Sequence, residues 1–366
     1  MKLRQLLFQV HLYAGLTVGA LLAVMGLTGA LSVFGEELNR HLQPEVWKVA
    51  PAGERVPVSR MLEAVVESQG GTKPRSLRIP ERPDAPVVAL MGPRRVYVDP
   101  YSGAVLGVRQ ARDGLVGTAR DLHVTLLSGE PGETVVGAAG CVLIVLALSG
   151  GVLWWPGRRK LSVGFTLRRP LVWRRANYDL HKLGGIASLL FLLLAGFTGV
   201  SLVFPEPFES VLRFITRAPP RSAPPKGGPV TGEPVPLDTL LAEADRALPG
   251  ARTTRIDLPS SPEAPLRVRK RFPEEFHPQG MSFVYVDRYG GGVLRAENAL
   301  EAPLATRLLA LRYPVHIGAW GGLVTRCIAV WTGLFPAGLF LTGFFMWLAR
   351  IRARSARAAS GSLLSE

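Results

Sequence analysis

Four of the six histidines in this 366-residue chain recur at matching positions in its two halves. His181 follows His11 by 170 residues, and His316 follows His123 by 193 residues. Neutral imidazole is a strong axial ligand for haem iron, and two imidazoles close both axial positions of one iron. The duplicated set therefore predicts two bis-histidine haem sites, which suit electron transfer rather than oxygen activation.

The sequence around these histidines is duplicated as well, which indicates that the chain consists of two related halves. The recurring segments are Leu27–Phe34 with Phe197–Phe204, Ser149-Gly150 and Trp154 with Thr342-Gly343 and Trp347, and Val96–Gly103 with Val284–Gly291. Their separations are 170, 193 and 188 residues. Insertions between the anchors would produce such differences.

Four apolar stretches, at residues 11–34, 134–155, 180–204 and 323–349, are long enough to cross about 30 Å of hydrocarbon as helices. Basic residues gather in the short connection between the second and third spans and in the tail after the fourth: Arg158, Arg159, Lys160, Arg168, Arg169, Arg174 and Arg175, then Arg350, Arg352, Arg354 and Arg357. This bias predicts that both termini are cytoplasmic and that the two long intervening segments lie outside.

Within this topology, His11 and His181 lie near the inner ends of the first and third spans, and His123 and His316 lie at the outer boundary. A helix rises about 1.5 Å per residue, which places His11 and His123 on opposite sides of the membrane. The geometry therefore pairs His11 with His181 and His123 with His316.

Glycines share the histidine faces of the first and third spans, at Gly15, Gly26 and Gly29 and at Gly185, Gly196 and Gly199. They suit either close helix packing or a flat macrocycle against the backbone. Packing histidines remain an alternative to ligands. A copper or zinc site would usually recruit thiolates or carboxylates, and no such residues sit at matching positions inside the spans.

Cationic side chains near the histidines are candidate partners for haem propionates. Arg120 and Arg312 precede the outer histidines by one helical turn, and Arg175 and Lys182 are candidates for the inner site. Lipid headgroups are an alternative partner for each of them. His41 and His277 have no counterpart in the other half, and we expect them to be ordinary surface histidines.

The two outer segments repeat a pattern of one helix followed by short strands. The predicted elements are a helix at 58–69 with strands at 76–79, 87–91, 95–98 and 104–108, and a helix at 237–248 with strands at 254–258, 266–270 and 282–286. The fold class is thus a membrane α-helical protein of two duplicated halves, each with an outer α+β domain. Residues 219–236 form a Pro- and Gly-rich linker into the second of these.

The predicted domains follow the chain in a simple order. They are transmembrane helix 1 (1–34), outer domain 1 (35–115), an outer histidine segment with transmembrane helix 2 (116–156), a cytoplasmic basic loop (157–179), transmembrane helix 3 (180–204), outer domain 2 (205–308), an outer histidine segment with transmembrane helix 4 (309–349) and a cytoplasmic tail (350–366).

The formal charge of +15 could suggest a nucleic-acid partner, but the basic residues cluster beside the apolar runs, so we expect a lipid bilayer and no nucleic acid. Cys141 and Cys327 fall inside spans and are expected to be small buried apolar residues. They cannot cross-link the outer segments.

The motifs of the spans and hairpins resemble those of the PepSY-associated transmembrane family, which includes iron-regulated inner-membrane siderophore reductases. The shared features are the His-x-x-x-Gly opening of the first and third spans, Leu122-His123, Ser149-Gly150 before Trp154-Trp155-Pro156, and the Tyr-Val-Asp-x-Tyr-x-Gly hairpins. The second half departs from the pattern because Trp347 stands alone without a following proline.

The resemblance implies periplasmic PepSY domains, two haem b groups on the same four histidines, and electron flow outward to a ferric siderophore that releases Fe(II). A cytoplasmic reductase or quinol would be the donor, since the sequence has no dinucleotide-binding fingerprint. The alternative is a membrane-anchored PepSY regulatory or binding protein without redox activity. A transporter built from repeats ranks last, because paired intramembrane charges and broken spans are not evident.

Overall fold

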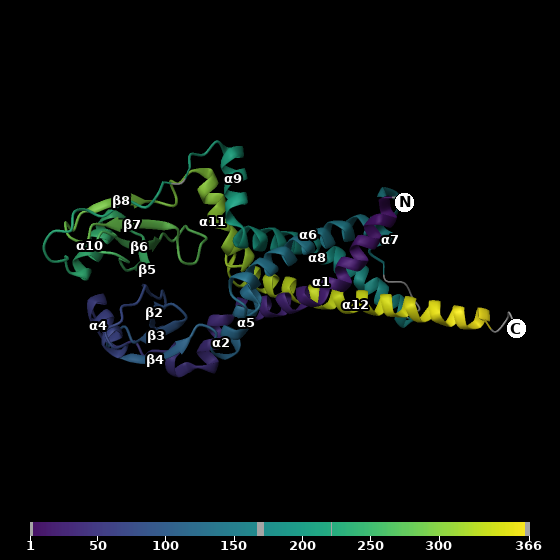
Figure 1. Cartoon of the computed structure of the whole chain (residues 1–366), viewed down its shortest axis with the longest axis horizontal. Helices are drawn as coiled ribbons and strands as arrows, with labels where there is room; N and C mark the ends of the chain where they lie inside the picture. Colours follow the sequence, from purple (N-terminus) through teal and green to yellow (C-terminus); the bar gives the residue numbers. More distant parts are fainter. Residues whose placement is uncertain (1–2, 167–171, 221, 363–366) are drawn as a thin grey trace. The chain divides into compact units, whose positions relative to one another are not determined.

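The structure of the protein is a computed structural model that describes residues 3–166, 172–220 and 222–362 (Figure 1). Lys2, Arg168 and Arg169 lie outside the described residues. The chain divides into two compact units. One comprises Met1–Val33, Ala119–Pro205 and Val315–Glu366, and the other comprises Phe34–Thr118 and Glu206–Pro314.

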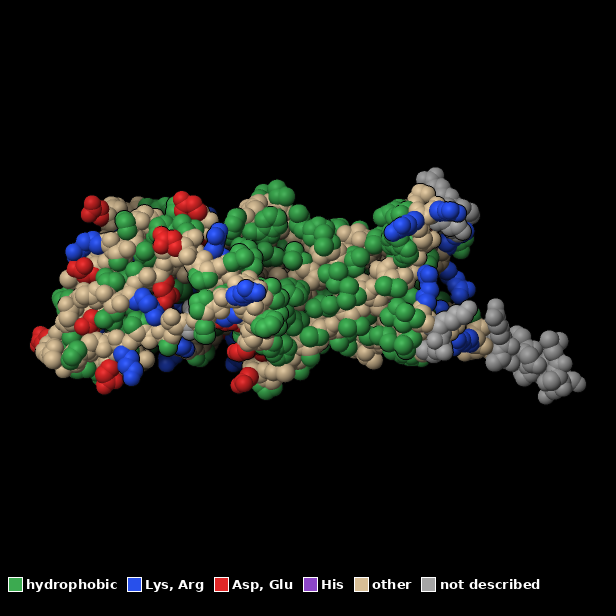
Figure 2. Space-filling model, turned by 90° about the horizontal axis from the view of Figure 1, so that it is seen from above, with side chains coloured by type: hydrophobic (Ala, Val, Ile, Leu, Met, Phe, Trp, Pro, Cys, Tyr) green, Lys and Arg blue, Asp and Glu red, His purple; other side chains and the backbone are tan. Residues whose placement is uncertain are grey.

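The first unit is a bundle of four long helices, each long and apolar enough to cross a membrane. They are α1 (Leu3–Val33), α6 (Glu130–Trp154), α8 (Trp173–Val203) and α12 (Gly322–Ser362). A short 3₁₀ turn at Arg158–Lys160 and α7 (Leu161–Gly164) follow α6. Figure 2 shows apolar side chains over the visible face of the bundle, with Lys and Arg gathered at one end. Such helices satisfy every backbone polar group internally, as a hydrocarbon environment requires.

The four helices are arranged as a ring in which α1 and α8 are each packed between α6 and α12. The closest approach joins α1 to α12, where a Cβ added to Gly26 or Gly333 would collide with the carbonyl oxygen of the other glycine. Backbones in direct contact are typical of membrane helix packing through small residues. Gly26 of the predicted glycine stripe therefore serves helix packing.

Helix α8 begins at Trp173, seven residues before the apolar run that predicts the third span. The additional turns carry buried polar residues that have partners. The Asn177 amide donates to the Thr342 carbonyl oxygen over 2.8 Å, and the Asp179 carboxylate is 3.0 Å from the Lys182 ammonium. A span predicted from hydropathy ends where polar residues begin. The helix itself can continue through polar residues whose side chains have hydrogen-bond or ion-pair partners.

The prediction that Cys141 and Cys327 are buried is wrong, because both side chains are exposed on the bundle surface. In a bundle of only four helices, much of each helix faces outward. An apolar residue in a span therefore need not lie in the interior.

The second unit contains an eight-stranded antiparallel sheet in the order β4-β3-β2-β1-β5-β6-β7-β8. The strands are β1 (Ser76–Arg78), β2 (Val87–Met91), β3 (Arg94–Val98), β4 (Val105–Gln110), β5 (Arg252–Asp257), β6 (Leu266–Arg271), β7 (Ser282–Val286) and β8 (Val293–Glu297). Strands of the two sequence repeats join through β1 and β5, where Leu77 pairs with Ile256. The local patterns predict seven of these strands but neither β8 nor this joint.

The remaining helices of this unit are short. They are α2 (Gly35–Leu42), α3 (Pro44–Trp47), α4 (Val58–Ser68), α9 (Pro205–Thr216) and α10 (Leu237–Ala247), while α5 (Gly114–Thr125) and α11 (Leu304–His316) lead from this unit into the bundle.

One face of the sheet carries a single apolar core that both sequence repeats share with α4 and α10. Val65 of α4 and Ala244 of α10 are fully buried in this core. The Asp238 carboxylate, in the first turn of α10, accepts a hydrogen bond of 2.9 Å from the Val58 amide at the start of α4. An acceptor at a helix N-terminus satisfies an otherwise unpaired donor, so this contact joins the two repeats.

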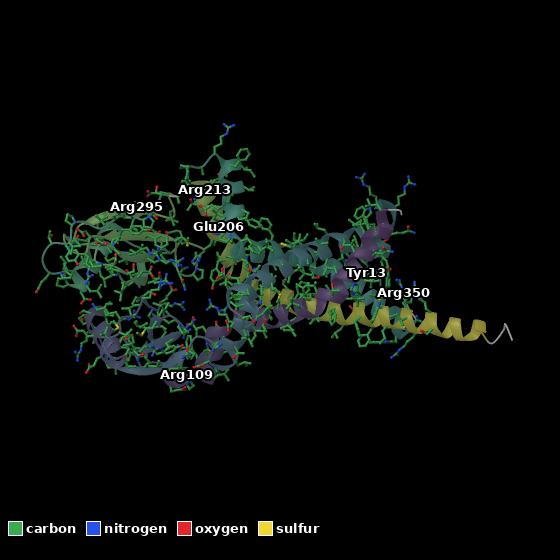
Figure 3. The ribbon with its side chains drawn as sticks, in the orientation of Figure 1. Tyr13, Arg109, Glu206, Arg213, Arg295 and Arg350 are labelled. Atoms are coloured by element: carbon green, nitrogen blue, oxygen red, sulfur yellow. The ribbon has the colours of Figure 1, made fainter. Side chains whose placement is uncertain are left out.

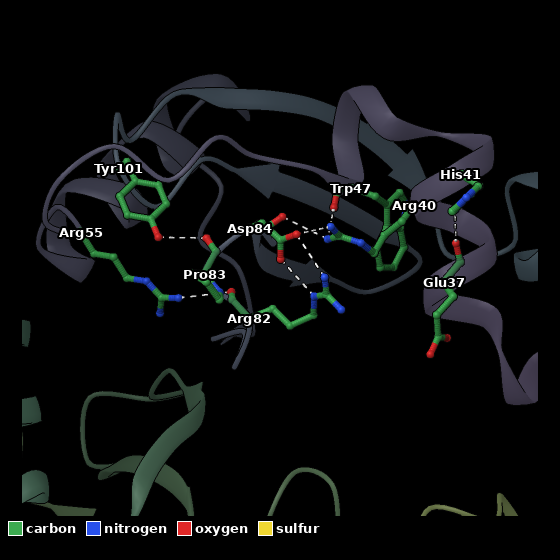
Figure 4. A network of polar contacts seen from close by, with 9 residues as sticks. All are labelled: Glu37, Arg40, His41, Trp47, Arg55, Arg82, Pro83, Asp84 and Tyr101. Carbon is green, nitrogen blue, oxygen red and sulfur yellow. Dashed lines mark hydrogen bonds and ion pairs between the residues drawn. The ribbon is translucent and has the colours of Figure 1, made fainter. Parts of the chain in front are cut away.

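The other face of the first repeat is covered by the segment that follows α1. Val46 and Trp47 pack on Val88 and Tyr97. Figure 4 shows the polar contacts beside them, where the buried Arg40 guanidinium donates to the Asp84 carboxylate over 2.5 Å and Arg82 donates to the same carboxylate over 3.0 Å. Hydrogen bonds from Arg82, together with the charge of Arg40, lower the pKa of Asp84 to about 2.

We predict that Asp84→Asn lowers the thermal stability of the full chain at pH 7. A depressed carboxyl pKa contributes stability that is present above the ordinary value of 3.8 and is lost as pH falls toward 2. The difference in melting temperature between wild type and variant should therefore narrow below pH 4, measured by intrinsic fluorescence in detergent. Glu63→Gln is a matched control because the Glu63–Arg60 pair is exposed and long, at 3.7 Å. Equal melting temperatures at pH 7 would contradict the prediction.

Candidate functional site: two histidine pairs in the helix bundle

The four duplicated histidines form two pairs inside the bundle unit. The first pair joins His11 of α1 to His181 of α8, with ring centroids 6.3 Å apart and ring planes at 89°. The second pair joins His123 of α5 to His316 of α11, with centroids 6.0 Å apart and planes at 42°. The structure thus brings together the histidines that the duplication pairs.

The two pairs are separated along α1. The His123 ring lies against Met25, whose carbonyl oxygen is 2.7 Å from Nδ1, whereas His11 stands 14 residues earlier in the same helix. At 1.5 Å per residue this corresponds to about 21 Å, most of the thickness of a hydrocarbon core. The bundle therefore holds its histidine pairs in two distinct layers.

Each imidazole is hydrogen-bonded through Nδ1 to a group on a neighbouring helix. His11 contacts the Ser149 hydroxyl (2.9 Å), His181 the Thr342 hydroxyl (2.8 Å), His316 the Thr198 hydroxyl (3.0 Å) and His123 the Met25 carbonyl oxygen (2.7 Å). Such contacts to the non-ligating nitrogen fix ring orientation at metal sites. Sequence analysis missed this role, although three of these hydroxyls belong to the duplicated Ser/Thr-Gly dipeptides.

The same contacts determine which nitrogen carries the proton. Each of the three hydroxyls donates its own hydrogen to a carbonyl oxygen one turn earlier in its helix, Ser149 to Val145 (2.7 Å), Thr342 to Gly338 (2.7 Å) and Thr198 to Leu194 (2.6 Å). A hydroxyl that has donated its hydrogen accepts from the imidazole, and a carbonyl oxygen only accepts. We infer that all four rings are protonated at Nδ1, which leaves each Nε2 lone pair available to a metal ion.

A glycine beside each hydrogen-bonding residue gives the ring its space. A Cβ added to Gly29 would lie 2.7 Å from Cε1 of His123, and Cβ atoms added to Gly150 and Gly199 would lie 3.1 Å from Cε1 of His11 and His316. The corresponding distance from Gly343 to His181 is 3.4 Å. Gly29 and Gly199 of the predicted stripe thus make room for imidazoles. The sequence alone suggested two other roles for these glycines, helix packing or contact with a macrocycle.

The ring separations match those of two imidazoles on opposite sides of one metal ion. A ligating imidazole nitrogen lies about 2 Å from its metal and roughly 1 Å from its own ring centre, so the two centroids lie about 6 Å apart. The described residues hold no group of three or more His, Cys, Asp or Glu side chains arranged for a metal ion. Two axial imidazoles require a planar ligand, such as a porphyrin, to complete the coordination of iron.

The first pair lines a cavity of about 1050 Å³. Its wall is mainly apolar, and Tyr13 and Arg350, labelled in Figure 3, are part of it. Cationic side chains gather there as well: Arg4, Lys182, Arg350 and Arg354. Of the two residues predicted to serve this layer, Lys182 lines the cavity and Arg175 is exposed. Arg4, Arg350 and Arg354 are cationic candidates that sequence analysis missed.

The other predicted cations and the unpaired histidines lie as follows. Arg120 is exposed on α5, and Arg312 donates to the Leu309 carbonyl oxygen of its own helix over 3.0 Å. His41 is exposed on α2 (Figure 4). His277 is only partly exposed, and its ring stacks on Tyr313 at 5.4 Å.

We predict that, in protein prepared without a cofactor, Thr342→Val removes the preference of the His181 proton for Nδ1. With the hydroxyl removed, ¹⁵N-histidine NMR should show the His181 proton redistributed between Nδ1 and Nε2, while the other three rings remain protonated at Nδ1. Thr17→Val is the control, because the Thr17 hydroxyl donates only within α1, to the carbonyl oxygens of Tyr13 and Ala14. A wild-type His181 protonated at Nε2 would refute the assignment.

Comparison with known proteins places the chain in a family. A family model described as "PepSY-associated TM region" matches residues 8–350. The chain belongs to this family, which confirms the family resemblance and identifies it as a membrane protein. It is also 26% identical over 254 residues to an uncharacterized protein, PA4219, of Pseudomonas aeruginosa, an alignment that covers 63% of this chain and 62% of that protein.

Proposed function

We propose that this member of the PepSY-associated TM region family carries two b-type haems on its histidine pairs and reduces an acceptor across the bacterial inner membrane. The acceptor that we propose is a ferric siderophore. The observation that carries the proposal is the pairing of four imidazoles at centroid separations of 6.3 and 6.0 Å, each with Nδ1 engaged.

The residues of the chain fit haem in three respects. Each pair holds its two imidazole rings at a centroid separation that suits two ligands of one iron. A glycine beside each ring leaves space that a larger side chain would fill, so the imidazoles can keep their orientation. In the first layer, a cavity of about 1050 Å³ combines apolar walls with four cationic side chains, as a flat macrocycle with two carboxylates requires.

Bound haem would supply one-electron redox chemistry. His11 with His181 would hold one haem and His123 with His316 the other, and two histidines on each iron would favour electron transfer over oxygen binding. The hydrogen bonds at Nδ1 hold the rings in place and raise the donor strength of Nε2. Arg4, Lys182, Arg350 and Arg354 would neutralise carboxylates in the first layer, and the apolar wall would limit access of water.

The orientation in this proposal rests on the charge of the chain. Arg158, Arg159 and the basic residues after the fourth span favour the cytoplasmic side for that end of the bundle, and the sheet unit would then be periplasmic. A cytoplasmic reductase or quinol is the donor in this proposal. Reduction of Fe(III) to Fe(II) by one electron weakens its bonds to hard oxygen ligands, so the chelate would release iron without cleavage of the chelator.

We expect purified wild-type protein to show a Soret band and two haems per chain in a dithionite-reduced minus oxidised spectrum. His11→Ala and His123→Ala should each lose about one haem, because each removes an axial ligand from one layer.

His41→Ala is the matched control and should retain both haems, since His41 is exposed on α2 of the sheet unit. Unchanged haem content in both ligand variants, or no haem in the wild type, would end the proposal and favour a PepSY regulatory protein without redox activity.

The two layers should respond separately to loss of their hydrogen-bonding hydroxyls. Ser149→Ala removes the partner of His11, and Thr198→Val removes the partner of His316. A less basic imidazole stabilises Fe(III) less, so each variant should raise one midpoint potential of the two and leave the other unchanged in a spectroelectrochemical titration. Movement of both potentials in either variant would contradict the assignment of these hydroxyls to separate layers.

A further inference from the structure

The sheet face opposite the apolar core is rich in arginine around β1, β5, β6 and β8. Strand alternation places seven arginines on it, which we call the arginine face: Arg78, Arg252, Arg255, Arg267, Arg269, Arg271 and Arg295. Arg295 of β8 is labelled in Figure 3. Core residues such as Val268 and Ile256 alternate with them on the other face.

Five of these arginines lie directly opposite another arginine on a neighbouring strand, and Arg252 with Arg271, across β5 and β6, is one such pair. Arg78 pairs with Arg255 across β1 and β5, and Arg255 pairs with Arg269 across β5 and β6. Like charges directly opposite in a sheet are destabilising. A row of three guanidinium groups therefore costs folding stability, which an anionic ligand would restore.

Three carboxylates pair with five of the seven arginines and neutralise part of this charge. Glu81 pairs with Arg252 and Arg271, and Glu297 pairs with Arg295. Asp257 accepts hydrogen bonds from Arg255 over 2.6 Å and from Arg267 over 2.8 Å. In the described part of the chain, the hydrogen bonds of Arg269 go only to neutral groups, the carbonyl oxygen of Gly280 and the side chains of Gln279, His277 and Met281. Burial is the main cause that lowers the pKa of Arg269 to about 10, and the charge of Arg255 contributes to it.

The guanidinium groups are held in position. Arg267 and Arg269 lie 5.5 and 5.6 Å from the centre of the Phe283 ring, and Arg295 lies 4.9 Å from that of Tyr285. Stacking on aromatic rings reduces the conformational freedom that a bound anion would otherwise have to remove. The Arg267 side chain remains 41% exposed, so this position is accessible.

His277 adds a neutral donor at the Arg269 end of the face. Its Nδ1 accepts a hydrogen bond of 3.1 Å from the Gln279 amide, so its proton is on Nε2. Burial is the main cause that lowers the pKa of His277 to about 3, and the charges of Arg269 and Arg271 contribute to it. The ring is therefore neutral at physiological pH. Its stacking partner Tyr313 precedes His316 by three residues in α11.

The first repeat carries fewer arginines on this face. Arg78 of β1 is one of them, and Arg95 of β3 lies opposite Arg109 of β4. There the same face carries Val88 and Tyr97, which are buried beneath Val46 and Trp47. The face is therefore basic in both repeats, partly covered in the first, and the second carries the larger number of arginines.

We propose that the arginine face binds the acceptor, and that this acceptor is an anionic iron chelate whose carboxylate or phenolate oxygens face Arg255, Arg267 and Arg269. This inference rests on the proposed function, and it adds the charge class of the substrate and the residues that select it. Guanidinium groups provide charge-assisted hydrogen bonds to such oxygens.

The test uses gallium(III) chelates, because Ga(III) resembles Fe(III) in coordination but is not reduced, so binding is measured apart from electron transfer. We expect full-length protein in detergent to bind a gallium tricatecholate of charge −3 at least tenfold more tightly than a neutral gallium trihydroxamate, by isothermal titration calorimetry. Arg267→Gln should weaken binding of the tricatecholate about tenfold, as expected for loss of one hydrogen bond to a charged group.

Arg109→Gln is the matched control. Arg109, labelled in Figure 3, is a β4 arginine paired with Glu45 over 2.6 Å in the first repeat, and its loss should change the affinity less than twofold. Equal affinities for the two chelates, or equal effects of the two variants, would overturn the proposal. Arg255→Gln provides a second variant if Arg267→Gln does not fold. Absorption spectra of the same samples report haem content, so failure of anion binding is distinguishable from failure of the proposed function.

Discussion

The hydrogen bond from each imidazole Nδ1 to a neighbouring helix is the interaction on which the bundle depends. A polar ring inside an apolar bundle costs several kcal/mol unless it has a partner, roughly as buried amides and hydroxyls do. His11 must therefore meet Ser149, and His181 must meet Thr342. These requirements place α1 beside α6 and α8 beside α12, which agrees with the observed ring of helices. The contacts that satisfy the histidines thus also orient the spans.

The same constraint operates in two layers of the bundle. Helices α1 and α8 each contribute a histidine to the first pair and the contact for a histidine of the second: Met25 and Gly29 receive His123, while Thr198 and Gly199 receive His316. One backbone therefore determines the position of both sites. A change at a Ser/Thr-Gly dipeptide would alter one layer directly, because each dipeptide contacts a single ring.

In the sheet unit, the two sequence repeats share one sheet but differ on the face opposite the core. The repeats pair through β1 and β5, and Asp238 of one repeat satisfies the start of α4 in the other. With a common core, each repeat is free to change its opposite face. Val46 and Trp47 cover part of that face in the first repeat, where Arg95 and Arg109 lie opposite each other. The second repeat carries the larger set of opposed arginines, a pairing that destabilises a sheet. In our proposal, this asymmetry gives each chain one site for the acceptor.

The sequence by itself determined the four apolar spans, the duplication of His11, His123, His181 and His316, their pairing, and seven of the eight strands, because each depends on composition, periodicity or repeat spacing. It did not determine the exposure of Cys141 and Cys327, the earlier start of α8 or the joint between β1 and β5. Those depend on which surfaces meet, often between residues more than 150 positions apart. The protonated nitrogen of each ring and the cavity around the first pair were likewise decided only by tertiary structure, since a hydroxyl fixes an imidazole only when packing brings the two within about 3 Å.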